Sequence, residues 1–154
     1  MISTSSKTAN GNGSRVAGRG KVLHFTNLDA WKVAHHLTLK IYEWTSTFPD
    51  EERFGLTSQM RRSAVSIESN IAEGFGRFGP ADKRNFYTIA RASCFEVESQ
   101  IITSRDLGHL SEENAKEGQR LCEKSRQTLN GLIRMRLQQP SHPVTRYPLP
   151  DLQS

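Results

Sequence analysis

The side chains with the clearest capacity for chemistry in this sequence are basic ones, and they gather in two stretches. Seven bases and three acids lie within residues 53–91, and four bases lie within residues 124–136 without an acid. A surface that binds nucleic acid needs such cations to contact phosphate groups. In the second stretch the cations have an alternative role, because they would stabilise the negative end of a helix. The residues predicted to bind nucleic acid are Arg61, Arg77, Lys83, Arg84, Lys124, Arg126, Arg134 and Arg136.

A glycine motif, G-x-G-x-x-G, spans residues 74–79. A dinucleotide-binding loop with this spacing follows a β-strand, whereas the residues before this motif have helical periodicity. The glycines therefore indicate a connection between helices. A weaker anion site remains open, because Arg77, Lys83 and Arg84 surround the N–H groups of the next helix. The two phenylalanines of the motif either stack on bases or fold over the end of the bundle.

The residue types of catalytic and metal sites are present, but their spacing does not match such sites. His35 and His36 are adjacent, so they point about 100° apart on a helix and cannot face one metal ion together. No nucleophile-elbow pattern occurs, and Cys94 and Cys122 are too few for a ligand cluster. We expect buried, reduced thiols. The sequence predicts no catalytic residue, no cofactor, no metal and no small-molecule substrate.

Four helices must position these residues, and the prolines mark where helices end. None of the six prolines lies in residues 50–79 or 81–139, and proline disrupts helix interiors. In the helical windows apolar side chains recur at three- and four-residue steps, which places them on one face. The expected helices cover residues 28–47, 56–73, 81–107 and 111–137. Asn27 and Ser111 are expected as N-caps, and Gly108 as a terminator.

The predicted fold class is all-α, an antiparallel up-and-down bundle of four helices. Short connections between successive helices favour this arrangement. The predicted core face of the third helix consists of Phe86, Ile89, Ala90, Ser93, Val97, Gln100, Ser104 and Leu107.

The third helix carries a second stripe, formed by Arg91, Phe95, Glu98 and Ile102, away from its core face. Two large apolar side chains in line with two charges predict an interface between subunits. The alternative is two scattered surface hydrophobes, which are common.

The second helix carries a polar stripe, formed by Arg62, Ser66, Asn70 and Glu73. Serine and asparagine are middling helix formers that solvent exposure alone does not require. The stripe is therefore interpreted as a structural hydrogen-bond network, with a solvated flank as the alternative.

Charge and composition divide the 154 residues into a folded part and two tails. Residues 1–24 contain four bases and no acid and are rich in Ser, Gly and Asn, which predicts a disordered basic tail. Residues 138–154 contain four prolines and predict an irregular tail. The domain at residues 25–137 is then nearly neutral, although the chain carries +5. No apolar run suits a membrane span or a secretory signal, so a cytoplasmic protein is expected.

The longest motif in the chain resembles one protein family. It reads FP at residues 48–49, FGL at 54–56, QMRRSAVSI at 59–67, NIAEG at 70–74 and ARAS at 90–93. This pattern resembles the four-helix-bundle proteins encoded in intervening sequences of bacterial large-subunit ribosomal RNA genes. The resemblance covers residues 25–137.

The resemblance implies a ring-shaped homopentamer. It also relates the chain to the accessory variability determinant of diversity-generating retroelements, which binds nucleic acid and a reverse transcriptase. The motif positions carried over are Arg62, Asn70, Glu73 and Arg91, and they are interpreted as structural or interface residues.

Two functions are expected from these observations. The first is a non-enzymatic, cytoplasmic, homo-oligomeric interaction protein with an unassigned cellular role. The alternative is a nucleic-acid-binding accessory protein that acts on structured RNA or DNA, alone or with a reverse transcriptase.

Overall fold

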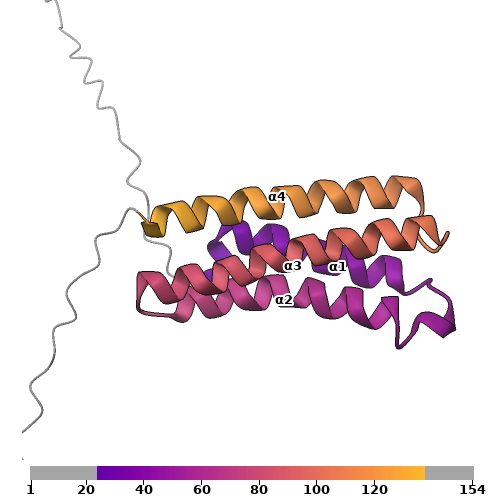
Figure 1. Ribbon diagram of the computed structural model, residues 1–154, viewed down its shortest axis with the longest axis horizontal. Coiled ribbons are helices and arrows are strands. Elements are labelled where there is room, and N and C mark those ends of the chain that lie inside the picture. Colours follow the sequence, from indigo (N-terminus) through magenta and orange to yellow (C-terminus); the bar gives the residue numbers. More distant parts are fainter. Residues whose placement is uncertain (1–23, 138–154) are drawn as a thin grey trace, which may run out of the picture.

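Four long α-helices and two short 3₁₀ turns make up the chain where the computed structural model describes it, at residues 24–137. They are η1 (Phe25–Asn27), α1 (Asp29–Thr45), η2 (Asp50–Glu52), α2 (Leu56–Gly76), α3 (Pro80–Asp106) and α4 (Glu112–Leu137). Successive helices run antiparallel, and no strand occurs among these residues (Figure 1). The prediction of an all-α fold with four helices is confirmed. The two predicted tails lie outside the described residues, apart from His24.

The four helices are arranged as the corners of a square. Helices α1 and α3 each pack against both α2 and α4, and within the described residues neither diagonal pair is in contact. The groove between α1 and α2 therefore lies on the opposite side of the bundle from the groove between α3 and α4. These two sides carry the surfaces described below.

The core of α1 and α2 follows the apolar stripes predicted from the sequence. Leu37, Ile41, Met60, Ile67 and Ile71 are all fully buried. Each buried side chain of this size contributes roughly 1.5–3 kcal/mol to folding. The three- and four-residue spacing in the sequence was sufficient to identify this half of the core.

The core face of α3 differs from the prediction. Ile89 and Leu107 were expected inside and are exposed, whereas Tyr87, Cys94 and Ile101 are buried instead. The buried positions of α3 include a seam that repeats every three and then four residues. This heptad spacing is the one that keeps a helix in continuous contact with neighbours in a bundle. The seam consists of Tyr87, Ala90, Cys94, Val97, Ile101 and Ser104.

Side chains cap the N-termini of α2 and α4, and one of the two caps was predicted. The Ser111 hydroxyl accepts a hydrogen bond from the backbone three residues later, as expected of an N-cap. Asn27 is not a cap, because it belongs to η1 and Leu28 takes the N-cap position of α1. At the start of α2 the Glu52 carboxylate accepts from the N–H of Leu56 at 3.0 Å. This glutamate caps the helix from the preceding turn.

Two glycines are required by the geometry. A Cβ on Gly74 would lie 2.7 Å from the Tyr87 ring, so glycine permits the close approach of α2 and α3. Gly108 has a φ of 78°, in the left-handed region that glycine adopts without strain. It ends α3, as the sequence predicted.

Candidate interaction surfaces

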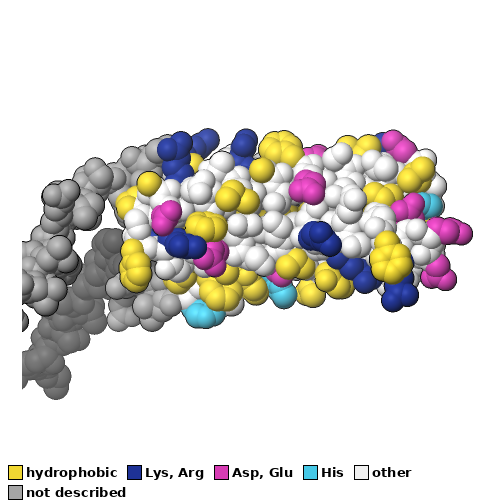
Figure 2. Space-filling model, turned by 60° about the horizontal axis from the view of Figure 1, so that its bottom comes forward, with side chains coloured by type: hydrophobic (Ala, Val, Ile, Leu, Met, Phe, Trp, Pro, Cys, Tyr) yellow, Lys and Arg dark blue, Asp and Glu magenta, His cyan; other side chains and the backbone are white. Residues whose placement is uncertain are grey.

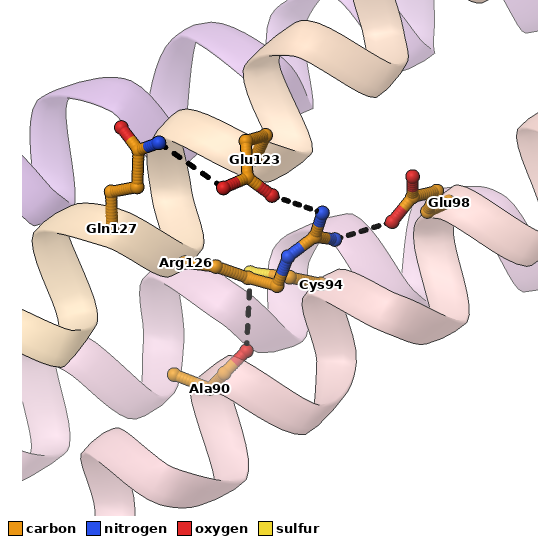
Figure 3. Close-up of polar contacts among 6 residues, drawn as sticks. All are labelled: Ala90, Cys94, Glu98, Glu123, Arg126 and Gln127. Carbon is orange, nitrogen blue, oxygen red and sulfur yellow. Dashed lines mark hydrogen bonds and ion pairs between the residues drawn. The ribbon is translucent and has the colours of Figure 1, made fainter.

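One half-exposed aromatic ring lies in the middle of the α3–α4 side. Phe95 is 49% exposed. Guanidinium groups flank its ring, that of Arg126 at 4.4 Å and that of Arg91 at 5.4 Å from the centroid. Arg126 reaches from α4 and donates hydrogen bonds to Glu98 of α3 and to Glu123 of its own helix (Figure 3). We call Arg91, Phe95, Glu98 and Arg126 together the Phe95 surface.

The structure thus brings three of the four predicted interface residues together around one ring. The fourth, Ile102, lies seven residues after Phe95 on the same stripe and is half-buried. Arg126, predicted to contact nucleic acid, has a side chain only 11% exposed and two carboxylate partners within the chain. Glu98 and Glu123 therefore neutralise the charge of Arg126, and its guanidinium group is not available to bind a phosphate.

The pKa shifts follow from this arrangement. Hydrogen bonds from Arg126 and then Gln127 hold the pKa of the Glu123 carboxyl below its usual range. Burial alone would lower the pKa of Arg126, but hydrogen bonds and charge from Glu123 and Glu98 raise it. Both groups stay charged near neutral pH. The α3–α4 side is tied together by a charged hydrogen-bond chain.

The two cysteines lie buried behind this surface, on the helices that carry it. Burial raises the pKa of Cys94 to about 12, and the thiol donates a hydrogen bond to the Ala90 carbonyl (Figure 3). The pKa of Cys122 is also raised, first by burial and then by its neighbour Cys94. Both thiols are unpaired and protonated at neutral pH. The prediction that both are buried is confirmed.

The predicted polar network on α2 forms only in its middle. The Ser66 hydroxyl bonds the Ser93 hydroxyl of α3 at 3.1 Å, and the Asn70 amide donates to Ser66. These three residues join α2 to α3. Arg62 and Glu73 are not part of this network: Glu73 binds Arg77, the residue that follows α2, at 2.6 Å, and Arg62 faces a hollow on the other flank of α2. The prediction of a network is confirmed for Ser66 and Asn70 and is wrong for Arg62 and Glu73.

At the α2–α3 connection, the predicted anion site is partly occupied by the chain itself. The Lys83 ammonium donates to the carbonyls of Gly74 and Phe75 at 3.3 and 2.6 Å. It thereby satisfies the carbonyls at the end of α2. Arg77 pairs with Glu73 beside a hollow of about 440 Å³ that also contains Asp82. Of the predicted cations here, Arg84 alone is exposed without a carboxylate partner in the described residues.

The two phenylalanines of this connection differ in their exposure to solvent. Phe78 is fully exposed, so the expectation that it folds over the bundle end is wrong. Phe75 is half-buried, with the Lys83 ammonium 5.6 Å from its ring centroid.

The α1–α2 side carries a hollow of about 500 Å³ between the end of α1, the turn η2 and the first turns of α2. Its lining contains three arginines, two aromatic side chains and hydroxyls, and no carboxylate. Figure 2 shows Lys and Arg side chains beside hydrophobic ones at this end of the bundle. We call this hollow the arginine cleft and define it by Tyr42, Arg53, Phe54, Ser58, Arg61 and Arg62.

The arginines of the cleft are held by aromatic rings and a hydroxyl. Arg61 lies 4.6 Å from the Tyr42 ring centroid and donates from Nε to the Thr45 hydroxyl at 2.9 Å. Arg53 lies 5.4 Å from the Phe54 ring centroid. The side chains of Arg53 and Arg62 have no hydrogen bond or ion pair within residues 24–137. Of the eight predicted nucleic-acid contacts, Arg61 belongs to this cleft.

The remaining predicted contacts lie on α4. Lys124 and Arg134 are exposed, and their side chains form no ion pair with the rest of the described chain. Arg136 belongs to the last turn of α4, and its side chain lies outside the described part. The basic end of α4 thus supplies separate cations and not a cleft.

Ser58 of the arginine cleft was missed from the sequence, and so were three residues outside α2, namely Tyr42, Arg53 and Phe54. Tyr42 lies on α1, and the other two lie in the connection before α2, so only folding brings them beside Arg61. A usable signal was present, since an Arg-Phe pair at residues 53–54 stands eight residues before the Arg-Arg pair at residues 61–62.

Within the described residues, no group of three or more His, Cys, Asp or Glu side chains is placed to hold a metal ion. His35 instead bonds Glu68 of α2 at 2.9 Å and stacks on Trp31. None of the described helices has the length and apolar character needed to cross a bilayer.

Comparisons with known proteins agree with the fold. The family model described as 23S rRNA-intervening sequence protein matches residues 26–131. A solved structure from Bacteroides thetaiotaomicron VPI-5482, described as a protein with unknown function from the S23 ribosomal protein family, matches with a TM-score of 0.63. It is 20% identical, and the match covers 68% of this chain and 95% of that one, which shows a shared fold. No curated protein matches.

Proposed function

This chain belongs to the 23S rRNA-intervening sequence protein family, and we propose that it is a non-enzymatic protein that associates with copies of itself and acts by binding. The similar solved structure is itself described as having unknown function. The proposal therefore depends on the surfaces of this chain.

The Phe95 surface is the observation that carries the proposal. Burial of a half-exposed phenylalanine against a second protein removes apolar area from water. Glu98 and Glu123 neutralise Arg126, whereas Arg91 has no ion pair among the described residues. A partner can therefore cover Arg126 without desolvating an unpaired charge, which is the main penalty at polar interfaces, and a carboxylate of the partner would pair with Arg91.

We propose a closed ring of five copies as the form of this assembly, as the family resemblance implies. The Phe95 surface occupies one side of the bundle, so a contact between it and a different surface of the next copy is heterologous. Heterologous contacts that close generate rings. The mass of such a ring is about 87 kDa, five times the 17.4 kDa of one chain.

Size-exclusion chromatography with light scattering tests self-association. The wild-type chain is expected at a multiple of 17.4 kDa at micromolar concentration. Phe95→Asp should shift it toward the single-chain mass, because the substitution removes the apolar ring and places a charged group in the contact. Phe95 is preferred to Ile102 here, since Ile102 is half-buried in the fold. A wild-type protein that stays monomeric up to 100 µM, on the order of weak-complex dissociation constants, would remove the proposal.

Action by binding is supported by the state of the nucleophilic groups. Cys94 and Cys122 are buried thiols whose raised pKa values keep them protonated. Two of the hollows contain cations and aromatic rings. A third is lined by Glu43, His109 and Ser111, but within the described residues no hydrogen bond joins Ser111 to His109, and the Ser111 hydroxyl caps α4. Unpaired thiols also support a reducing compartment such as the cytoplasm.

Nucleic acid is the second candidate partner. Cations with no carboxylate partner in the described chain support it, and they lie in the arginine cleft and near the opposite end, at Arg84 and Arg134. Binding of a fluorescent structured RNA should fall steeply as salt rises, because released counterions drive phosphate contacts. Absence of any anisotropy change at low salt would remove this candidate.

A further inference from the structure

We infer that the arginine cleft binds single-stranded nucleic acid, with phosphates on its guanidinium groups and a base on Phe54. This proposal rests on the second candidate function and assigns it a site. The proposal concerns the α1–α2 side, opposite the Phe95 surface.

Charge is the first argument. Three guanidinium groups face one hollow whose lining includes no acid. The turn η2 contains three acids, none of which lines the hollow, and Glu52 is directed elsewhere: it caps α2 at Leu56 and lies 3.6 Å from His109. The cleft thus keeps an unneutralised positive field, and guanidinium groups bind phosphate oxygens in a bidentate manner.

The exposed rings are the second argument. Phe54 is 87% exposed and Tyr42 44% exposed. An isolated exposed ring would carry no meaning, but here both rings line a cationic hollow. Aromatic side chains beside a positively charged groove are how proteins hold single strands, since every base has a face for stacking.

The third observation is that one arginine side chain of the cleft is already held in place by contacts within the chain. Arg61 is fixed against Tyr42 and Thr45, so one guanidinium is already oriented before a ligand arrives. Arg53 and Arg62 have no side-chain hydrogen bond in the described chain and are available to the ligand. The hydroxyls of Thr57 and Ser58 lie in the same lining and are donors suited to phosphate or sugar oxygens.

A single strand fits these features better than other anionic partners. A duplex hides its base faces within the stack, so the exposed rings would have no role. An acidic protein segment could pair with the guanidinium groups, but its carboxylates would not stack on the rings of Tyr42 and Phe54. Structured RNA offers single-stranded loops whose bases are free to stack, which connects this site to the broader function.

The test is fluorescence anisotropy with a labelled 12-nucleotide single-stranded RNA at low and moderate salt. Three guanidinium contacts predict a slope of about −2 in log affinity against log salt. Arg53→Gln/Arg62→Gln should weaken binding at least tenfold and reduce the slope by about 1.4. Phe54→Leu keeps an apolar side chain without a ring and should weaken binding about tenfold, at unchanged slope.

The matched control is Lys116→Gln/Arg120→Gln, which removes two exposed positive charges from α4, outside the cleft. It should change affinity less than threefold. Equal weakening by both double variants would overturn the cleft as the site while leaving nucleic-acid binding intact. No binding by the wild-type protein would overturn both.

Competition and mass measurements identify other occupants. Unlabelled single-stranded RNA should displace the probe at a lower concentration than the matched duplex or polyglutamate. Displacement by polyglutamate at the same concentration would assign the cleft to an acidic protein and overturn the proposal. Loss of the wild-type oligomer in Arg53→Gln/Arg62→Gln would overturn it in favour of a subunit contact.

Discussion

The two opposite sides of this bundle both carry an arginine against an aromatic ring, yet their surroundings differ. On the α3–α4 side, Arg126 lies over Phe95 and is bound by Glu98 and Glu123. On the α1–α2 side, Arg61 lies over Tyr42 among other arginines, with no acid in the lining. The residue types alone are similar. The carboxylate partners decide that the first arginine belongs to the fold and that the second group can serve a ligand.

Thiol labelling should show the largest contrast between the two sides. At pH 8 a group with a pKa of about 12, as for Cys94, has a thiolate fraction on the order of a thousandfold below that of an exposed cysteine. Cys94 and Cys122 should therefore react with Ellman's reagent only as the chain unfolds. In Phe54→Cys, one added thiol in the cleft should react within seconds. Immediate reaction of both native thiols in the folded protein would show that the α3–α4 side is not closed.

Replacement of arginine by methionine should lower the free energy of unfolding more on the α3–α4 side than in the arginine cleft. Arg126→Met leaves the part-buried Glu98 carboxylate without its partner, and we expect a loss of about 1–3 kcal/mol. Arg62→Met in the cleft removes no intramolecular ion pair, so its effect should stay within about 0.5 kcal/mol. Urea unfolding followed by the fluorescence of Trp31 and Trp44 measures both. Equal losses would contradict the contrast.

Acid should remove the stability that the ionised Glu123 contributes on the α3–α4 side, and this effect should be smaller than that of Arg126→Met. The folded-state pKa of Glu123 is lowered by Arg126, so unfolding takes up a proton as the pH falls. The stability that Glu123 adds is present above about pH 4.3, its usual value, and is lost as pH falls through the folded value. The difference in Tm between wild type and Glu123→Gln should therefore shrink from pH 6 to pH 3. Growth of that difference on acidification would contradict the pairing.

The sequence predicted what depends on periodicity and missed what depends on packing between helices. The spacing of Met60, Ile67 and Ile71 identified one core face, because each residue of a stripe is buried by the same neighbours. For α3, Ile89 was placed inside and Tyr87 was not, because two partner helices share that face and no single-helix pattern states their positions. The bundle itself follows from local periodicity.

The candidate sites show the same limit. The spacing of the residues revealed the α3 stripe. The pairing of its Glu98 with Arg126 depends on which face of α4 lies beside α3. Lys83 was interpreted as an anion ligand, since its bonds to Gly74 and Phe75 arise only from the shape of the connection. The arginine cleft combines α1, η2 and α2, and its members are distant in the sequence. Partners across helices are the information that one-dimensional spacing lacks.

A paired substitution tests the division of roles most directly. Phe95→Asp and Phe54→Asp place the same charge on opposite sides, and light scattering gives the molar mass of each purified variant. The account predicts that Phe95→Asp falls toward 17.4 kDa, whereas Phe54→Asp keeps the wild-type multiple. The reverse pattern, with Phe54→Asp dissociated and Phe95→Asp intact, would contradict the account.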